Sequence, residues 1–306
     1  MKTRFLIALA ATVTAAAVAG AAVRAAGYVP STGSLGGFPP SWTRIEGTPG
    51  GGSVWSGVIP NRLDRQEGPS AIYVPPGFSF ANRYPVLYLL HGLPGSPSSY
   101  FDSLRLGTVF DELIASRRAV PMIVVMPQGP TRETDEWAGP WESYIVHDVV
   151  PWVDAHLPTV SEAHARVLGG LCAGGYGAMD IGLRNPTLFG ALESWEGYFA
   201  PVFRDGPFVT ATKTLLAANN PMLLVRRDAM LLQRDGTPFY VSVGGDHAAV
   251  RRVWSLEFAS LLATLRLPYT LWELPPSQQG HFWAATLPSA LEFASASVAR
   301  PGQTFA

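Results

Sequence analysis

The stretch that decides the fold runs from residue 166 to residue 180 and reads Arg166-Val-Leu-Gly-Gly-Leu-Cys172-Ala-Gly-Gly-Tyr-Gly-Ala-Met-Asp180. An apolar strand leads into Gly-x-Cys-x-Gly, and small residues then open a helix. This is the pattern of a nucleophile elbow, a sharp strand-to-helix turn, with cysteine in the usual place of serine. Gly170 and Gly174 let the strand and the helix approach closely. The pattern predicts that Cys172 is a solvent-reachable nucleophile, although a lone cysteine elsewhere is usually a small buried hydrophobic residue.

Strand and helix patterns alternate on both sides of this turn, which is typical of an α/β fold with a mostly parallel sheet. The run at 84–90 is continuously apolar, as expected of a strand that is buried on both faces. Residues 141–156 have helical spacing. We therefore predict one domain over residues 53–300, with helices on both faces of the sheet. Its expected strands are 53–59, 70–74, 84–90, 121–126, 166–171, 191–195, 238–243 and 269–274.

Two segments depart from this alternation. Residues 26–52 contain Gly-Gly-Phe-Pro-Pro and Gly-Thr-Pro-Gly-Gly-Gly and are predicted to be a linker or surface loop. Residues 199–236 hold Pro201, Pro207, a predicted helix near 211–218 and a polar stretch. We interpret them as a small cap or lid inserted over the carboxyl edge of the sheet.

The amino terminus predicts export. Lys2 and Arg4 precede the uncharged run 5–23, and Ala19-Gly20-Ala21 fits the small-x-small cleavage rule, with Val23-Arg24-Ala25 as a second candidate. We predict a signal peptide over residues 1–25, or an uncleaved membrane anchor, and hence a secreted or cell-envelope protein. A single cysteine excludes an internal disulfide framework. The net charge of -1 gives no electrostatic reason to expect a nucleic-acid partner.

Three further pieces complete a candidate catalytic site. The loop His91-Gly92-Leu93-Pro94-Gly95 follows a buried strand, where such a loop supplies one oxyanion N–H, here from Leu93, while Ala173 supplies the other. Asp246 comes directly after the strand pattern at 238–243 and two glycines, and His281 follows the last strand. Nucleophile, acid and histidine thus occur in the chain order of α/β-hydrolases. The histidine would deprotonate the nucleophile and the acid would orient the imidazole.

Several assignments stay open at this point. His247 competes with His281, and Glu193 or Glu196 could replace Asp246 as the acid. His91 is expected to shape its loop, and the remaining histidines are expected to be solvated: His147, His156 and His164. Four tryptophans could line an acyl or sugar site, although aromatic residues are more often simply packed in a core: Trp137, Trp141, Trp195 and Trp283.

At these residues the chain resembles the esterase group of α/β-hydrolases that includes esterase D, feruloyl esterase-like enzymes and the secreted mycolyltransferases of mycobacteria. The resemblance covers most of the chain after residue 52. It is carried by Tyr73-Val-Pro-Pro-Gly-Phe, Tyr84-Pro-Val-Leu-Tyr-Leu-Leu-His-Gly, the elbow with Gly175-Tyr-Gly-Ala, and Gly280-His-Phe-Trp. It implies acyl transfer from an ester or thioester to water or to another hydroxyl. The departure is Cys172, where this group usually has serine; the related dienelactone hydrolases and polyhydroxyalkanoate synthases do use cysteine.

The first hypothesis is an exported acyl hydrolase or acyltransferase with a Cys172–His281–Asp246 triad and a small-molecule or cell-envelope acyl ester as substrate. A thioester intermediate is reactive towards transfer, which slightly favours a transferase. The second hypothesis is an inactive homologue that binds glycans or lipids. A third is that the cysteine replaced a serine recently. No metal or organic cofactor is expected, because the sequence shows no His/Cys ligand cluster and no glycine-rich phosphate loop.

Overall fold

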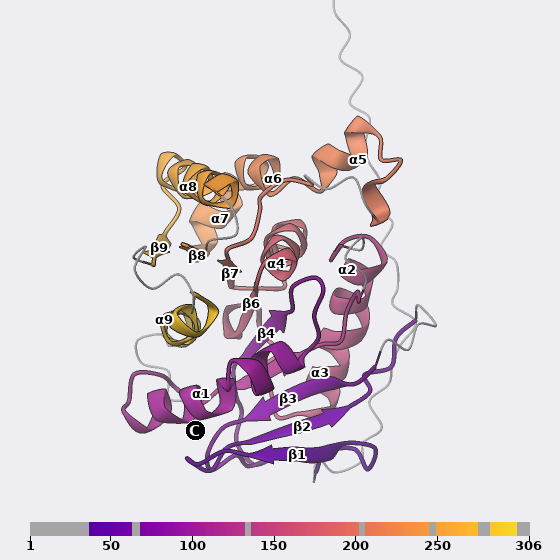
Figure 1. Cartoon of the computed structure of the whole chain (residues 1–306), viewed down its shortest axis with the longest axis vertical. Helices are drawn as coiled ribbons and strands as arrows, with labels where there is room; N and C mark the ends of the chain where they lie inside the picture. Colours follow the sequence, from indigo (N-terminus) through magenta and orange to yellow (C-terminus); the bar gives the residue numbers. More distant parts are fainter. Residues whose placement is uncertain are drawn as a thin grey trace, which may run out of the picture. The chain divides into compact units, whose positions relative to one another are not determined.

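In the computed structural model, nine strands of the described part of the chain form one sheet (Figure 1). The structure describes residues 37–62, 68–131, 136–201, 206–244, 249–274 and 282–298. The strand order is β1-β2-β3-β5-β4-β6-β7-β8-β9. The strands are β1 (Thr43–Gly47), β2 (Ser53–Gly57), β3 (Ser70–Val74), β4 (Val86–Leu90), β5 (Ile123–Met126), β6 (Arg166–Gly170), β7 (Ala191–Trp195), β8 (Phe239–Val243) and β9 (Tyr269–Glu273).

The prediction of a mostly parallel sheet is confirmed. β4 pairs in parallel with β5 and β6, and parallel pairing continues through β7, β8 and β9. The first three strands are antiparallel to one another, and β3 joins β5 in the antiparallel sense. Every residue of β4 and β6 is buried, as expected for central strands covered on both faces. The carboxyl ends of β4, β6, β7, β8 and β9 therefore meet at one edge of the sheet.

Helices cover both faces because the side chains of each strand alternate between them. Leu87 and Leu89 of β4 pack with α1 and α9 on one face, whereas Tyr88 and Leu90 pack with α2, α3, α4 and α8 on the other (Figure 1). The α-helices are α1 (Leu106–Ala115), α2 (Pro140–Tyr144), α3 (Val150–His156), α4 (Ala173–Arg184), α5 (Lys213–Ala218), α6 (Pro221–Arg227), α7 (Ala229–Asp235), α8 (Ala249–Thr264) and α9 (Phe282–Val298). π-helical turns occupy Ser99–Ser103 and Ile145–Val149, and 3-10 turns occupy Ala163–Ala165 and Gly206–Phe208.

The prediction of a linker up to residue 52 is wrong in its last part. β1 lies inside that segment, and Trp42 beside it is buried in the core. The carboxylate of Asp111 on α1 fixes the turn after β1, since it accepts hydrogen bonds from the Thr48 hydroxyl, the Gly52 N–H (3.1 Å) and the Tyr73 hydroxyl (2.6 Å). Four of the five residues of β1 are exposed, so this edge strand lacks the apolar alternation that identifies a strand in sequence.

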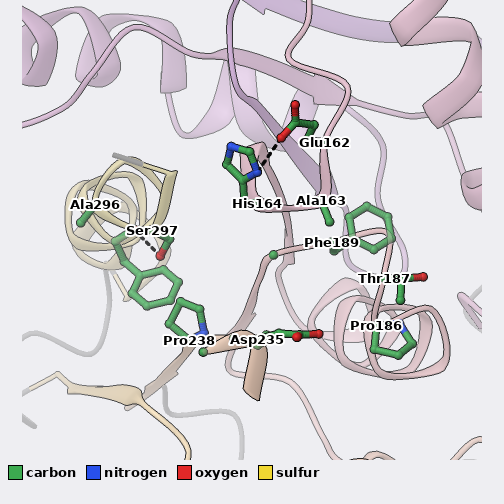
Figure 2. A pocket seen from close by; sticks show the side chains of 14 residues that line it. Glu162, Ala163, His164, Pro186, Thr187, Phe189, Asp235, Pro238, Ala296 and Ser297 are labelled. Carbon is green, nitrogen blue, oxygen red and sulfur yellow. Dashed lines mark hydrogen bonds and ion pairs between the residues drawn. The ribbon is translucent and has the colours of Figure 1, made fainter. Parts of the chain in front are cut away.

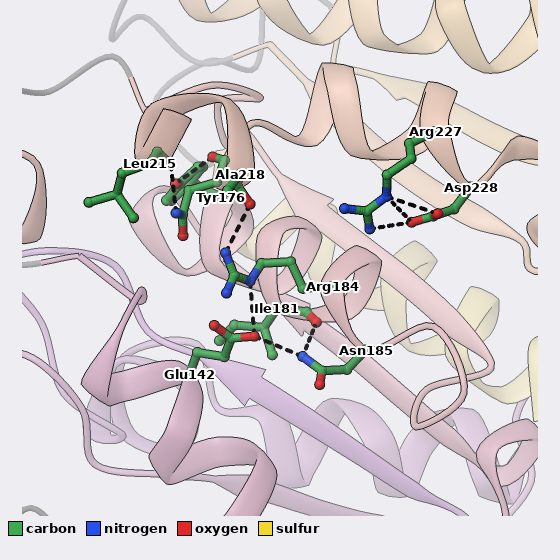
Figure 3. A network of polar contacts seen from close by, with 10 residues as sticks. Glu142, Tyr176, Ile181, Arg184, Asn185, Leu215, Ala218, Arg227 and Asp228 are labelled. Atoms are coloured by element: carbon green, nitrogen blue, oxygen red, sulfur yellow. Dashed lines mark hydrogen bonds and ion pairs between the residues drawn. The ribbon is translucent and has the colours of Figure 1, made fainter. Parts of the chain in front are cut away.

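The predicted insertion between β7 and β8 contains three short helices, α5, α6 and α7. We call residues 206–235 the cap. Two hydrogen bonds from α4 hold α5: the Tyr176 hydroxyl donates to the Asn219 carbonyl, and Arg184 Nη1 donates to the Ala218 carbonyl, both at 2.9 Å (Figure 3). Helix α5 itself buries no residue, so these contacts carry much of its attachment.

The predicted export signal at residues 1–25 lies outside the described residues. Within the described ranges, no helix is both long and apolar enough to cross a membrane.

Candidate active site

Cys172 occupies the turn between β6 and α4 in an unusual backbone conformation. Its φ is 55° and its ψ is −116°, values that cost a non-glycine residue about 1–3 kcal/mol. The surrounding structure holds this conformation: the Cys172 N–H donates to the Trp195 carbonyl at 2.9 Å, and the Cys172 carbonyl accepts from Gly175 and Tyr176. The side chain is only partly buried. Cys172 is therefore presented at the carboxyl edge of the sheet, directly before the first turn of a helix.

The flanking glycines have the steric role that the sequence predicted. A Cβ at Gly174 would overlap the Leu90 carbonyl oxygen, and a Cβ at Gly170 would overlap the backbone of Gly174. Helix α4 consequently begins in direct contact with β4 and β6. Any larger residue at either position would push the nucleophile away from the sheet.

The two predicted oxyanion donors come from neighbouring elements. A Cβ at Gly92 would lie 3.2 Å from the Cys172 Cβ, so the loop after β4 passes directly beside the nucleophile. The side chain of Leu93 packs on the same apolar cluster as Ala173. Neither the Leu93 N–H nor the Ala173 N–H donates a hydrogen bond to any part of the chain that the structure describes. Two free N–H groups beside a nucleophile are what an oxyanion hole requires.

Tyr100 joins these two elements, although nothing in the sequence marked it. Its hydroxyl donates to the Leu90 carbonyl (2.8 Å) and accepts from the Leu171 N–H (3.2 Å). The ring packs edge-on against Trp195, with centroids 5.7 Å apart. Complete burial raises the pKa of Tyr100 well above its ordinary value, so the hydroxyl keeps its proton and remains a donor.

A second pair that the sequence did not indicate lies in the apolar cluster beside Ala173. The Tyr198 hydroxyl donates to both carboxylate oxygens of Glu136, at 2.6 and 2.7 Å. Its ring stacks on Tyr176 at 4.8 Å, and Phe208 from the cap completes the cluster. Burial, followed by the nearby Glu136 charge, raises the pKa of Tyr198 well above its ordinary value. The elbow is therefore bordered by aromatic side chains and one buried carboxylate.

His91 supports the loop that carries Leu93. Its Nδ1 lies 2.8 Å from the Gly92 carbonyl, and its own carbonyl accepts from Trp137 Nε1 at 2.8 Å. Burial lowers the pKa of His91 to about 4, so the ring is neutral at neutral pH. These contacts agree with the loop-shaping role expected from the sequence.

The acid and the base of the predicted triad are not described. Asp246, His281 and the competing His247 all lie outside the described residues. Of the alternative acids, Glu193 lies inside β7, where Trp195 Nε1 donates to it at 2.8 Å. Burial raises its pKa to about 8, so at neutral pH it lacks the negative charge that an orienting acid needs. Glu196 follows β7 at the carboxyl edge, with a φ of 50° and its N–H bonded to the Ser242 carbonyl.

The other histidines are only in part solvated as predicted. His147 is exposed, but His156 stacks on Trp152 at 4.3 Å, and His164 lies 3.1 Å from Glu162 in an ion-pair geometry. These contacts could not be predicted from the sequence, because they leave no mark on the local spacing of apolar and polar residues. The four tryptophans pack against core residues: Trp137, Trp141 and Trp195 are buried and Trp283 is partly buried.

A cavity of about 780 Å³ lies at the other end of the sheet (Figure 2). Its walls are the segments that precede β6, β7 and β8 together with the end of α9, whereas Cys172 follows β6. The cavity therefore belongs to the amino edge, and volume alone does not locate the candidate site. Its lining includes His164, Glu162, Phe189, Asp235 and Pro238. Across the described ranges, no group of three metal-ligating side chains is present.

The chain is similar in sequence and in structure to known proteins. The family model described as "Putative esterase" matches residues 63–282, which include the elbow, the loop after β4 and the cap. The chain belongs to this esterase family. The chain shares 32% identity over 130 residues with an endo-1,4-beta-xylanase/feruloyl esterase of Xylanibacter ruminicola, covering 39% of the chain and 18% of the relative. An esterase of Mycobacterium tuberculosis is 31% identical over 123 residues, or 37% of the chain and 25% of the relative. The chain thus matches well under two thirds of the length of either relative.

Solved structures establish the fold independently. A ferulic acid esterase superposes with a TM-score of 0.69 at 20% identity and covers 80% of this chain and 98% of its own. An S-formylglutathione hydrolase from Agrobacterium tumefaciens gives a TM-score of 0.64 at 18% identity, covering 81% of this chain and 96% of its own. The chain has the α/β-hydrolase fold that the sequence predicted, and its family supports a carboxylic ester hydrolase. Esterases of this family typically use serine as the nucleophile.

Proposed function

We propose that this esterase is an exported acyl hydrolase or acyltransferase in which Cys172 is the nucleophile. The observation that carries the proposal is the backbone of Cys172, which adopts the strained elbow conformation with its side chain partly exposed. A cysteine that served only as core packing would not need φ and ψ values of this cost. The N–H groups of Leu93 and Ala173, which have no hydrogen-bond acceptor among the residues that the structure describes, support the same conclusion.

The proposed reaction has two steps. His281 takes the proton of the Cys172 thiol, the sulfur attacks the carbonyl carbon of an ester, and the Leu93 and Ala173 N–H groups stabilise the resulting oxyanion. The C–O bond to the alcohol then breaks, His281 protonates the leaving alcohol, and a thioester remains on Cys172. His281, oriented by Asp246, next takes a proton from water or an acceptor alcohol, whose oxygen attacks the thioester and releases the thiol.

The start of helix α4 at Ala173 assists this chemistry. The N-terminus of a helix carries a partial positive charge, which stabilises negative charge that develops beside it during the reaction. Export, as the signal-like residues 1–25 suggest, would give the unpaired thiol an extracellular role. Aromatic acyl esters are the first substrates to test, because relatives of this chain are named feruloyl esterases.

The decisive experiment is reaction of the purified protein with p-nitrophenyl acetate, followed by mass spectrometry of the intact chain. We expect one acetyl adduct on Cys172, and prior alkylation of the thiol by iodoacetamide should prevent it. A thiol that alkylates normally but never accepts the acetyl group would contradict the proposal and favour a non-catalytic binding protein.

The variant Cys172→Ser separates a sulfur-adapted site from a recent replacement of serine. We expect the serine variant to hydrolyse the ester more slowly, since the site is proposed to work with a thiolate. An increase by orders of magnitude would instead show that the site remains adapted to serine. Asp246→Asn and His281→Ala test the other two members of the triad.

A further inference from the structure

The loop that carries Leu93 is closed at its base by one side chain. The chain leaves β4 at Leu90, passes Gly92 and Leu93, and returns to Tyr100, whose hydroxyl donates to the carbonyl of Leu90 at 2.8 Å. Tyr100 is fully buried, so water does not compete for this bond. The loop thus begins and ends at the same hydrogen bond.

The same hydroxyl also contacts the nucleophile's strand. It accepts from the N–H of Leu171, the residue directly before Cys172, at 3.2 Å. That N–H also lies 3.2 Å from the Leu90 carbonyl, so three polar groups share one junction. Edge-on contact with Trp195 fixes the ring, and the Trp195 carbonyl in turn accepts from the Cys172 N–H. Tyr100 therefore touches the base of the oxyanion loop, the residue before the nucleophile and the strand that bonds to the nucleophile.

We infer that Tyr100 is a positioning residue that sets the distance between the Leu93 N–H and Cys172. The inference rests on the proposed function, because it assigns Tyr100 a role in the acylation of Cys172. An oxyanion hole works only when its donors lie within hydrogen-bond reach of the developing negative charge. A junction that ties the donor's loop directly to the nucleophile's strand keeps these two parts in register. The phenylalanine variant keeps the ring contact with Trp195 and removes the two hydrogen bonds of the hydroxyl, while the direct bond from the Leu171 N–H to the Leu90 carbonyl remains.

The test compares Tyr100→Phe with the wild type in two reactions of the same thiol. Acylation by p-nitrophenyl acetate needs the oxyanion donors, whereas alkylation by iodoacetamide needs only the thiol. We expect the variant to acylate about 10-fold or more slowly, with the change in kcat and not in KM. Its alkylation rate should stay within about twofold of the wild type, because the nucleophile itself is untouched.

Tyr73→Phe is the matched control. Tyr73 lies on β3, away from the elbow, and its buried hydroxyl donates to Asp111 of α1 at 2.6 Å. The control variant therefore also removes a buried tyrosine hydroxyl. If Tyr100 only stabilised the fold, both variants would lose melting temperature and neither would separate acylation from alkylation. Acylation of Tyr100→Phe at the wild-type rate, or equal losses in the two reactions, would overturn the inference alone. A wild-type protein that forms no acyl adduct would contradict the proposed function, and the role of Tyr100 with it.

Discussion

The carboxyl and amino edges of the parallel sheet differ in backbone strain and in hydrogen bonding. The amino edge holds the cavity of about 780 Å³, with His164 Nδ1 3.1 Å from a carboxylate oxygen of Glu162 on its wall. The carboxyl edge holds the strained Cys172, the proposed nucleophile, and two N–H groups with no acceptor among the described residues. Strain and unpaired donors persist only where surrounding contacts enforce them, whereas a surface hollow needs no such enforcement. The difference favours the carboxyl edge as the proposed active site, which agrees with the rule that ligands of open α/β sheets bind at the carboxyl ends of strands.

The largest effect is expected when one side chain at each edge is substituted and the two rates of ester hydrolysis are compared. Cys172→Ala should reduce ester hydrolysis at least about 10³-fold, because no nucleophile remains. His164→Ala, on the wall of the cavity, should leave the rate within about twofold. Both rates are measured with p-nitrophenyl acetate on variants whose melting temperatures match the wild type. Equal losses in the two variants would mean that the amino edge takes part in catalysis.

A second contrast is between the buried carboxyl group of Glu193 in β7 and the exposed carboxylate of Glu162 at the amino edge. The pKa of Glu193 is raised from 4.5 to about 8 by burial, so folding takes up a proton between these values. This contribution to stability is fully present below pH 4.5 and is lost as the pH rises towards 8. In the Glu193→Gln variant, residue 193 cannot titrate. The unfolding free energy of the variant should therefore fall between pH 5 and pH 8 by about 3 kcal/mol less than that of the wild type.

Glu162→Gln, which removes an exposed carboxylate at the amino edge, is the control for this measurement. Exposed ion pairs contribute little, so its stability should follow the same pH dependence as the wild type. Urea unfolding at both pH values gives the free energies. A Glu193→Gln variant whose pH dependence equals that of the wild type would show that Glu193 is ionised in the native state.

The two edges also differ in how much room they leave around a glycine. Gly174 has no room for a Cβ against Leu90, whereas Gly236, before β8 at the amino edge, has nothing within 4 Å and only its φ of 66° to favour glycine. Gly236→Ala should cost about 1 kcal/mol, as expected for a left-handed residue. Gly174→Ala should cost about 2 kcal/mol more, because backbone must move. Thermal unfolding measures both, and equal costs would mean that the elbow adapts to a methyl group.

The sequence predicted the parts of this fold that repeat a local pattern. The strands at 70–74 and 191–195 were predicted with their observed bounds, because each is a continuous buried run between clear turn signals. β1 was missed, since its exposed side chains give no alternation. At the site, the elbow and its loop follow from glycine spacing. Tyr100 and the Tyr198–Glu136 pair do not, because their partners lie 71 and 62 residues away in the chain and leave no local mark.

The smallest expected effect concerns the cap. Helix α4 runs away from the elbow to Arg184, which donates to Glu142 (3.0 Å) on α2 and to the Ala218 carbonyl (2.9 Å) of the cap (Figure 3). Arg184→Met keeps the aliphatic stem and removes both contacts, which should cost about 1 kcal/mol and speed proteolysis of the cap. Arg227→Met, which removes an exposed pair with Asp228 inside the cap, should change neither. If limited proteolysis treats the two variants alike, Arg184 does not hold the cap, and α4 would hold it through Tyr176 alone, which packs against Phe208 and donates to the Asn219 carbonyl.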